Sequence, residues 1–339
     1  MRRLVLALAL ALAPIASQAG ENASAAQTNA QDADEPTYAI STRTDRIGRV
    51  LAPVLINGKG PYRFLVDTGA NRSVIGPRLA ASMGLAPTAH APSATVHGVT
   101  GSKVAPVVQV ATLQADRLVL RNQELPVLDG GVLAGADGMF GVDGLAGRRL
   151  FVDFLNDRIE ITSARQRVSL ANAVTLKGRL HFGALLLTRA KIGAVPVAAV
   201  IDTGADRSVG NGALLRALRA SAAPMADLGD VEFSGATGVT MRGRLIYLPS
   251  FQVGDSLEVA RLPTVMADAH VFDIWGLRDE PAILVGMDIL GQVEAMSIDY
   301  RRAELQLVFP ASIRSRTLPA SAILPNATRL RPSERPSKN

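Results

Sequence analysis

The sequence predicts an all-β protein of two lobes in one chain, related by a pseudo-two-fold axis, each with a short helix. A carboxylate-bearing turn occurs twice, as FLVDTGANRSVIG from Phe64 to Gly76 and as AVIDTGADRSVGN from Ala199 to Asn211. Apolar segments typical of strands lead into both turns. Further segments recur around the turns in the same order, which indicates a duplicated domain.

The chain of 339 residues begins with a segment typical of a secretory signal peptide. A positive start, Arg2 and Arg3, precedes an apolar run and small residues around Ala19. Because the run is short for a membrane span, we expect a signal peptide at residues 1–19 that is cleaved near Ala19. A short buried helix or an uncleaved anchor is the alternative. Cleavage predicts a periplasmic or secreted protein.

Two further segments flank the predicted lobes. Residues 20–37 have the composition of a flexible leader, and residues 311–339, rich in Pro, Ser and Arg, that of a disordered basic tail. Between them we expect an N-terminal lobe at residues 38–165 and a C-terminal lobe at residues 166–310. A tail that contacts anionic surfaces is the alternative to plain disorder.

The net charge of +6 belongs to the ends of the chain. The predicted signal peptide contributes +2 and the tail +5, so residues 20–310 carry −1. A basic binding face on the folded body is therefore not indicated, and nucleic acid is not expected as a partner.

Several other kinds of active site find no support in the sequence. The chain has no cysteine, which excludes disulfides and thiolate chemistry. Its four histidines lack the spacing of metal ligands, so no metal is expected. The glycine-rich segment 129–138 fits neither a phosphate-binding loop nor a dinucleotide fingerprint, and we expect no cofactor. The nucleophilic-serine motif G-x-S-x-G is also missing.

The repeated segments extend well beyond the two turns. Glycine-marked hairpin tips follow, VHGVTG at Val96–Gly101 and FSGATG at Phe233–Gly238. The segments ELPVL and RLPTV come next. Two stretches then begin with Gly-x-Asp-x-Leu, at Gly141 and Gly286, and each ends in an alternating strand pattern. The second copy is longer before its Gly-x-Asp segment, and the extra residues include HVFDIWGLRDEP from His270 onward, with the only tryptophan.

Each repeated turn places an aspartate at the end of an apolar strand. A carboxylate in that position is costly unless it is paired or hydrogen-bonded. The threonine that follows can fix the loop, and the glycine lets the backbone turn tightly and approach another segment. A single Asp-Thr-Gly turn would have an ordinary capped turn as its plain alternative. Two copies in matched repeats predict that Asp67 and Asp202 lie side by side.

With these turns, hairpin tips and Gly-x-Asp-x-Leu segments, the sequence resembles the retropepsin-like (retroviral-type) aspartic proteases, in a tandem single-chain bacterial form. The resemblance covers residues 40–310 in two halves. It implies a polypeptide substrate, no cofactor and no metal. In such enzymes two close carboxyl groups share one proton. The ionised group activates a water that attacks the amide, and the protonated group stabilises the oxyanion.

The resemblance also implies roles for individual residues. Asp67 and Asp202 correspond to the catalytic pair. The other residues of the two turns correspond to the active-site loops: Thr68, Gly69, Ala70, Thr203, Gly204 and Ala205. The hairpin tips correspond to flaps that close over the substrate. Substrate-binding roles are expected for two turn residues and four flap glycines: Asn71, Asp206, Gly98, Gly101, Gly235 and Gly238.

The two copies differ in one clear polar position, Asn71 against Asp206. This difference predicts a directional substrate groove, with neutral drift as the alternative. Arg72 and the second copy's arginine either brace the turns or are exposed charges. The aspartates Asp143 and Asp288 of the Gly-x-Asp segments are expected to be structural, because in the family this segment begins a helix.

The resemblance leads to expectations about activity as well. Alanine follows each Asp-Thr-Gly where pepsin-like lobes more often carry a hydroxyl group, so the pair should keep its proton to higher pH. We therefore expect a mildly acidic to neutral optimum. We also expect a monomeric endopeptidase with the pair formed in cis. The alternatives are a catalytically silent peptide-binding module of the same fold and pairing of each half with its counterpart in another molecule.

Overall fold

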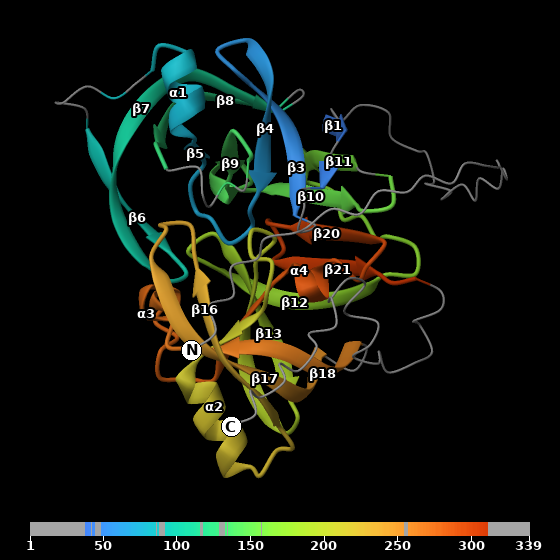
Figure 1. Ribbon diagram of the computed structural model, residues 1–339. Helices are drawn as coiled ribbons and strands as arrows, with labels where there is room; N and C mark the ends of the chain where they lie inside the picture. The colour runs from blue at the N-terminus through green and yellow to red at the C-terminus, as the bar shows by residue number, and fades with distance from the viewer. Residues whose placement is uncertain are drawn as a thin grey trace, which may run out of the picture.

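The computed structural model describes residues 38–310 except residues 42, 45–48, 86, 88–91, 116–117, 129–132, 134, 157 and 254–256. The predicted signal peptide, leader and tail lie outside the described residues. The described part folds into two lobes made mostly of strands, one above the other in Figure 1, with a shared sheet between them. None of its helices is long and apolar enough to cross a membrane.

The N-terminal lobe is an antiparallel sheet with one parallel pairing. Its strand order is β5-β9-β4-β3-β7-β6, with β2 on β3 and β8 on β7. The strands of this half of the chain are β1 (Tyr38–Ser41), β2 (Arg43–Thr44), β3 (Val50–Ile56), β4 (Lys59–Val66), β5 (Val74–Ile75), β6 (Ser93–Gly98), β7 (Gly101–Ala115), β8 (Leu118–Pro126), β9 (Gly138–Phe140), β10 (Arg148–Asp153) and β11 (Arg158–Ser163).

The C-terminal lobe repeats this arrangement. The order β13-β14-β19-β15-β18-β17-β16 forms the body of the lobe and continues into the sheet between the lobes. The strands of this half are β12 (Val174–His181), β13 (Ala184–Ile192), β14 (Val195–Ile201), β15 (Val209–Gly210), β16 (Ala226–Ser234), β17 (Thr240–Val253), β18 (Leu257–Met266), β19 (Ala282–Val285), β20 (Ala295–Asp299) and β21 (Glu304–Val308).

Both aspartates follow a strand that pairs in parallel with a later one. β4 runs parallel to β9 and β14 runs parallel to β19. The short strands β5 and β15 pair with the other edges of β9 and β19. The chain from β4 to β5 must therefore cross the carboxyl end of β9, and the segment that crosses carries Asp67. The segment from β14 to β15 carries Asp202 in the same way.

A sheet between the lobes joins them. Its order β1-β11-β10-β20-β21-β12 has three strands from each half, so the pseudo-two-fold axis passes between β10 and β20. These two strands pair antiparallel, with Phe151 opposite Ser297. On the same pair, Arg149 lies 3.4 Å from Asp299, and both side chains are buried. The hydrogen bonds of this sheet hold the two lobes in a defined relation.

The core is filled mainly by Val, Leu and Ile, as the scarcity of aromatic residues requires. One large apolar cluster runs through both lobes and the shared sheet, and includes Phe64, Leu113, Phe251 and Ile298. Two smaller clusters lie near the cleft between the lobes, one in each lobe.

Short helices occur at the predicted Gly-x-Asp segments, as a 3₁₀ turn at Val142–Gly144 and as α4 (Met287–Leu290). Three other helices were not foreseen from the sequence, namely α1 (Pro77–Ser82), α2 (Gly212–Ala220) and α3 (His270–Ile274). The first two follow the repeated turns at matching places. The third lies in the longer segment of the second copy, which has no helix at the matching place among the described residues of the first.

Candidate active site

The structure brings the two predicted catalytic residues together. Asp67 and Asp202 are 9% and 6% exposed, and their carboxyl groups share a hydrogen bond. The Oδ1 atom of Asp67 also accepts backbone N–H groups from the two residues after Thr68, at 2.8 and 2.9 Å. Asp202 accepts the matching groups in its own loop, at 2.8 and 3.2 Å. These donors offset part of the cost of burying the carboxylates.

Glycine is needed in both loops because each loop lies against the opposite carboxyl group. A Cβ atom on Gly69 would lie 2.5 Å from Cγ of Asp202. One on Gly204 would overlap the carboxyl group of Asp67. Any side chain at either position would push the two aspartates apart.

The two threonines connect the loops across the pseudo-two-fold axis. The N–H of Thr68 donates to Oγ1 of Thr203 at 3.1 Å, and the reverse bond is also 3.1 Å. Each hydroxyl donates in turn to a backbone carbonyl of the other lobe, Ile201 at 3.0 Å and Val66 at 2.8 Å. Both threonines are buried, so this network of four bonds fixes the loops without help from solvent.

The aspartates of the two Gly-x-Asp segments also hold the active-site loops in place. Asp143 accepts the N–H and hydroxyl of Ser73 at 2.9 and 2.8 Å. Asp288 accepts the same two groups of Ser208 at 3.0 and 2.7 Å. Each serine hydroxyl also accepts a backbone N–H of the glycine before the helix, at 3.1 Å. The two aspartates therefore join the repeated turns to the short helices.

Burial raises the pKa of both central carboxyl groups above the ordinary value of 3.8. The pKa of Asp202 is raised further by the charge of Asp67 beside it. For Asp67, a hydrogen bond from Asp202, two backbone N–H groups and the positive charge of Arg49 oppose the effect of burial on the pKa. The pair therefore keeps a proton to higher pH than a free aspartate would, and the pKa of Asp202 is raised more than that of Asp67.

Asp67 and Asp202 together form a catalytic-type dyad of carboxyl groups. The two hairpins predicted to be flaps meet above this dyad. The hydroxyl of Thr100, at the tip of β6–β7, donates to the carbonyl of Val239 at 2.6 Å and accepts the N–H of Gly235 at 2.9 Å. Gly98 lies against Thr237, where a Cβ atom would come within 3.2 Å of the threonine methyl group. One threonine thus ties the two tips together.

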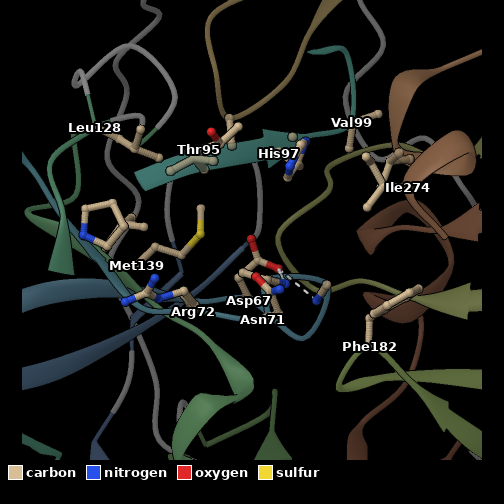
Figure 2. Close-up of a pocket in the computed structure, with 18 of the residues that line it drawn as sticks. Asp67, Asn71, Arg72, Thr95, His97, Val99, Leu128, Met139, Phe182 and Ile274 are labelled. Carbon is tan, nitrogen blue, oxygen red and sulfur yellow. Dashed lines mark hydrogen bonds between the residues drawn. The ribbon is translucent and has the colours of Figure 1, made fainter. Parts of the chain in front are cut away.

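A pocket lies under the flaps and reaches both aspartates. Figure 2 shows Leu128, Met139 and Arg72 on one side of Asp67, and Ile274 and Phe182 on the other. Described residues that line the pocket are Asp67, Gly69, Ala70, Asn71, Arg72, Val74, Ala94, Thr95, Val96, His97, Gly98, Val99, Pro126, Leu128, Met139, Phe182, Asp202, Ala236, Val271, Ile274 and Trp275.

The pocket contains only some of the predicted substrate-binding residues. Of the described residues, Asn71 and Gly98 line it, whereas Asp206 does not. The other flap glycines lie at the hairpin tips. Gly101 lies beside Val239, Gly235 beside Thr100, and Gly238 has a φ angle of +75°, which favours glycine.

The model of the aspartyl protease family matches this chain twice, at residues 52–143 and 188–289. The chain belongs to the aspartyl protease family. Each match contains one Asp-Thr-Gly turn and one Gly-x-Asp segment, which confirms the predicted tandem arrangement of two lobes. No curated protein matches the chain significantly.

Arg49 is a residue of this aspartyl protease site that the sequence reasoning missed. It precedes β3, is 6% exposed, and its guanidinium donates to the carbonyl of Gly204 at 3.3 Å. The matching stretch of the second copy, residues 181–187, contains no lysine or arginine. The missing counterpart is a sequence signal that could have singled out Arg49. In the structure, Arg49 places a positive charge near Asp67.

The arginine after Asn71 is held by the N-terminal lobe of the protease. Arg72 donates to the backbone carbonyl of Glu124 at 3.1 Å and lies 3.6 Å from its carboxylate. Both side chains are largely exposed, so this ion pair adds little stability. Within the described part of the chain, no cluster of three or more His, Asp or Glu residues is placed to hold a metal ion.

Replacement of Thr68 or Thr203 by valine is expected to destabilise the protease. The variant keeps the side-chain volume but leaves buried backbone groups without partners, so we expect a loss of roughly 2–4 kcal/mol in the free energy of unfolding. Denaturant unfolding followed by fluorescence of the buried Trp275 measures this loss. Serine at the same position keeps the hydroxyl and should retain most of the stability. An equal loss for serine and valine would show that the hydrogen bonds are not the cause.

Stability is expected to depend on pH through Asp288, whose pKa is raised by burial to about 6. The folded state binds this proton more tightly than the unfolded state, so the contribution is complete below about pH 4 and lost as the pH rises through about 6. We expect wild type to lose up to roughly 2 kcal/mol from this group between pH 4 and pH 7, and Asp288→Asn to lack that decline. Asp143→Asn, the same substitution at the matching position of the first copy, is the control. Parallel stability curves for wild type and Asp288→Asn would contradict the assignment.

Proposed function

We propose that the chain is an exported aspartic endopeptidase, in which a water molecule activated between Asp67 and Asp202 hydrolyses peptide bonds. The observation that carries this proposal is the buried pair of carboxyl groups, which share a hydrogen bond where two cross-linked loops meet. Membership of the aspartyl protease family supports a peptidase at the level of the family.

The two carboxyl groups have different environments, which suggests a division of roles. Asp67 has Arg49 nearby and serves as the ionised group that takes a proton from the attacking water. Asp202 carries the shared proton and donates a hydrogen bond to the carbonyl oxygen as negative charge develops on it. A proton then passes to the leaving nitrogen as the carbon–nitrogen bond breaks. Each turnover consumes one water molecule and leaves the dyad with its single proton.

The surrounding structure supports a polypeptide substrate. The pocket crosses the dyad under two flaps, which would cover an extended chain and exclude bulk water. Both aspartates come from one chain, and the sheet between the lobes holds them together, so the proposed enzyme acts as a monomer. The N-terminal segment typical of a signal peptide supports export to the periplasm or the exterior.

The direct test compares wild type with Asp67→Asn and Asp202→Asn on a denatured protein mixture. We expect each variant to lose activity by a factor of at least about 1,000, because neither can complete the acid–base pair. The exposed Asp227 provides a matched control, and Asp227→Asn should retain activity. If wild type cleaves nothing at any pH, a peptide-binding module of the same fold becomes the better description. Full activity in one dyad variant would contradict the shared mechanism.

The pH dependence of kcat/KM gives a second test. Asp67 must be ionised, so activity rises as the pH passes its pKa, which lies above 3.8. Asp202 must be protonated, so activity falls as the pH passes its higher pKa. We therefore expect a bell-shaped profile with its maximum above about pH 4, in the mildly acidic to neutral range. A maximum below about pH 3 would contradict the proposed environments of the dyad.

A further inference from the structure

The two lobes place matching apolar clusters at the cleft. The N-lobe cleft cluster includes Leu65, Val74, Leu128 and Met139. The C-lobe cleft cluster includes their counterparts in the repeat, Val200, Val209, Val265 and Leu284. The correspondence also holds in the strand pairings, since Leu65 opposes Met139 as Val200 opposes Leu284. A symmetric enzyme would offer similar apolar walls on both sides of the dyad.

The longer segment of the C-terminal lobe breaks this symmetry. Its residues Val271, Phe272, Trp275 and Leu277 pack onto the C-lobe cleft cluster and are buried there. Phe272 is 1% exposed and meets Trp275 edge to face, with ring centroids 6.4 Å apart. Helix α3 therefore covers the wall that the second lobe would otherwise present to the cleft.

The pocket is accordingly different on its two sides. On the N-lobe side it is lined by the cluster residues Val74, Leu128 and Met139. Of the described residues, their counterparts in the C-terminal lobe do not line it; Val271, Ile274 and Trp275 do instead. Figure 2 shows Ile274 and Phe182 on the side of Asp67 opposite Leu128 and Met139.

Helix α3 is held in place by contacts with both lobes. The N–H of Val271 donates to the carbonyl of Val99 at the N-lobe flap tip, at 3.2 Å. On the same flap strand, Nδ1 of His97 lies 3.2 Å from Nε2 of His270.

Hydrogen bonds also hold the C-terminal end of this longer segment. Nε2 of His181 lies 2.6 Å from the carbonyl oxygen of Trp275. The fully buried amide of Asn211 donates to the carbonyls of Leu277 and Glu280, both at 2.8 Å. With bonds at its start, middle and end, the segment forms a fixed wall of the pocket.

We infer that α3 makes the substrate groove one-sided, so that the protease accepts a large apolar side chain only on the N-lobe side of the scissile bond. There the substrate side chain meets Val74, Leu128 and Met139. On the other side it meets Ile274 and Phe182, and only a small residue such as Gly, Ala or Ser fits. This inference rests on the proposed endopeptidase function and names its substrate class, polypeptides with a large apolar residue next to a small one.

The test is a cleavage-site profile of wild type and variants on a denatured protein mixture, read by mass spectrometry. Wild type should prefer large apolar residues on one side of the cleaved bond and small residues on the other. Two wall residues are accessible for substitution, since Ile274 is 36% and Phe182 59% exposed. In the variant Ile274→Ala/Phe182→Ala, we expect kcat/KM for peptides with Leu or Phe on the restricted side to rise at least about 10-fold. The preference on the other side should not change.

A matched control is Leu155→Ala, which removes an apolar side chain that is 69% exposed on the turn after β10 and should leave the profile unchanged. Large residues accepted equally on both sides by wild type would overturn the inference while the proposed function stands. A double variant with the wild-type profile would overturn it as well. A wild type that cleaves nothing, with its fold intact by Trp275 fluorescence, would instead contradict the proposed function and the inference with it.

Discussion

Two buried carboxyl groups that share a hydrogen bond form the contact on which the rest of this structure depends. Their mutual repulsion and loss of hydration oppose folding, so the chain must hold them in place by other contacts. Backbone N–H groups at each loop, the exchange between Thr68 and Thr203, and the glycines that allow close approach supply those contacts. Asp143 and Asp288 extend this support into each lobe.

The duplication explains the symmetric arrangement of the two lobes. The places where the two copies differ make the site asymmetric. The sheet between the lobes and the crossing loops are symmetric, which places equivalent aspartates against each other. Arg49 and helix α3 have no matching group among the described residues of the opposite lobe. The first lowers the pKa of Asp67, and the second gives the pocket two unlike walls. A peptide is itself directional, so a site for one peptide orientation benefits from such differences.

Sequence reasoning identified Asp67 and Asp202 because the physical cost of a carboxylate on an apolar strand is visible locally and recurs in matched repeats. It also indicated the glycines, since close approach of two loops admits no side chain. It did not find Arg49, whose role arises only when β3 of one lobe meets the loop of the other. Asn71 and Asp206 occupy matching positions in sequence, but of the two only Asn71 lines the pocket in the described structure. Helix α1, with six residues, is too short to show a clear period, whereas α2 carried signals that were overlooked, an N-cap at Asn211 and apolar residues four positions apart at Leu214 and Leu218.

The sequence alone determined the family, the two-lobe β architecture and the identity of the paired aspartates, because each of these is encoded in repeated local patterns. The tertiary structure decided how burial and nearby charges shift the pKa of each aspartate, how Thr100 joins the flaps, and which residues form the two walls of the pocket. These properties depend on groups that are far apart in the chain. The burial, charge and packing around each group exist only once the lobes have come together.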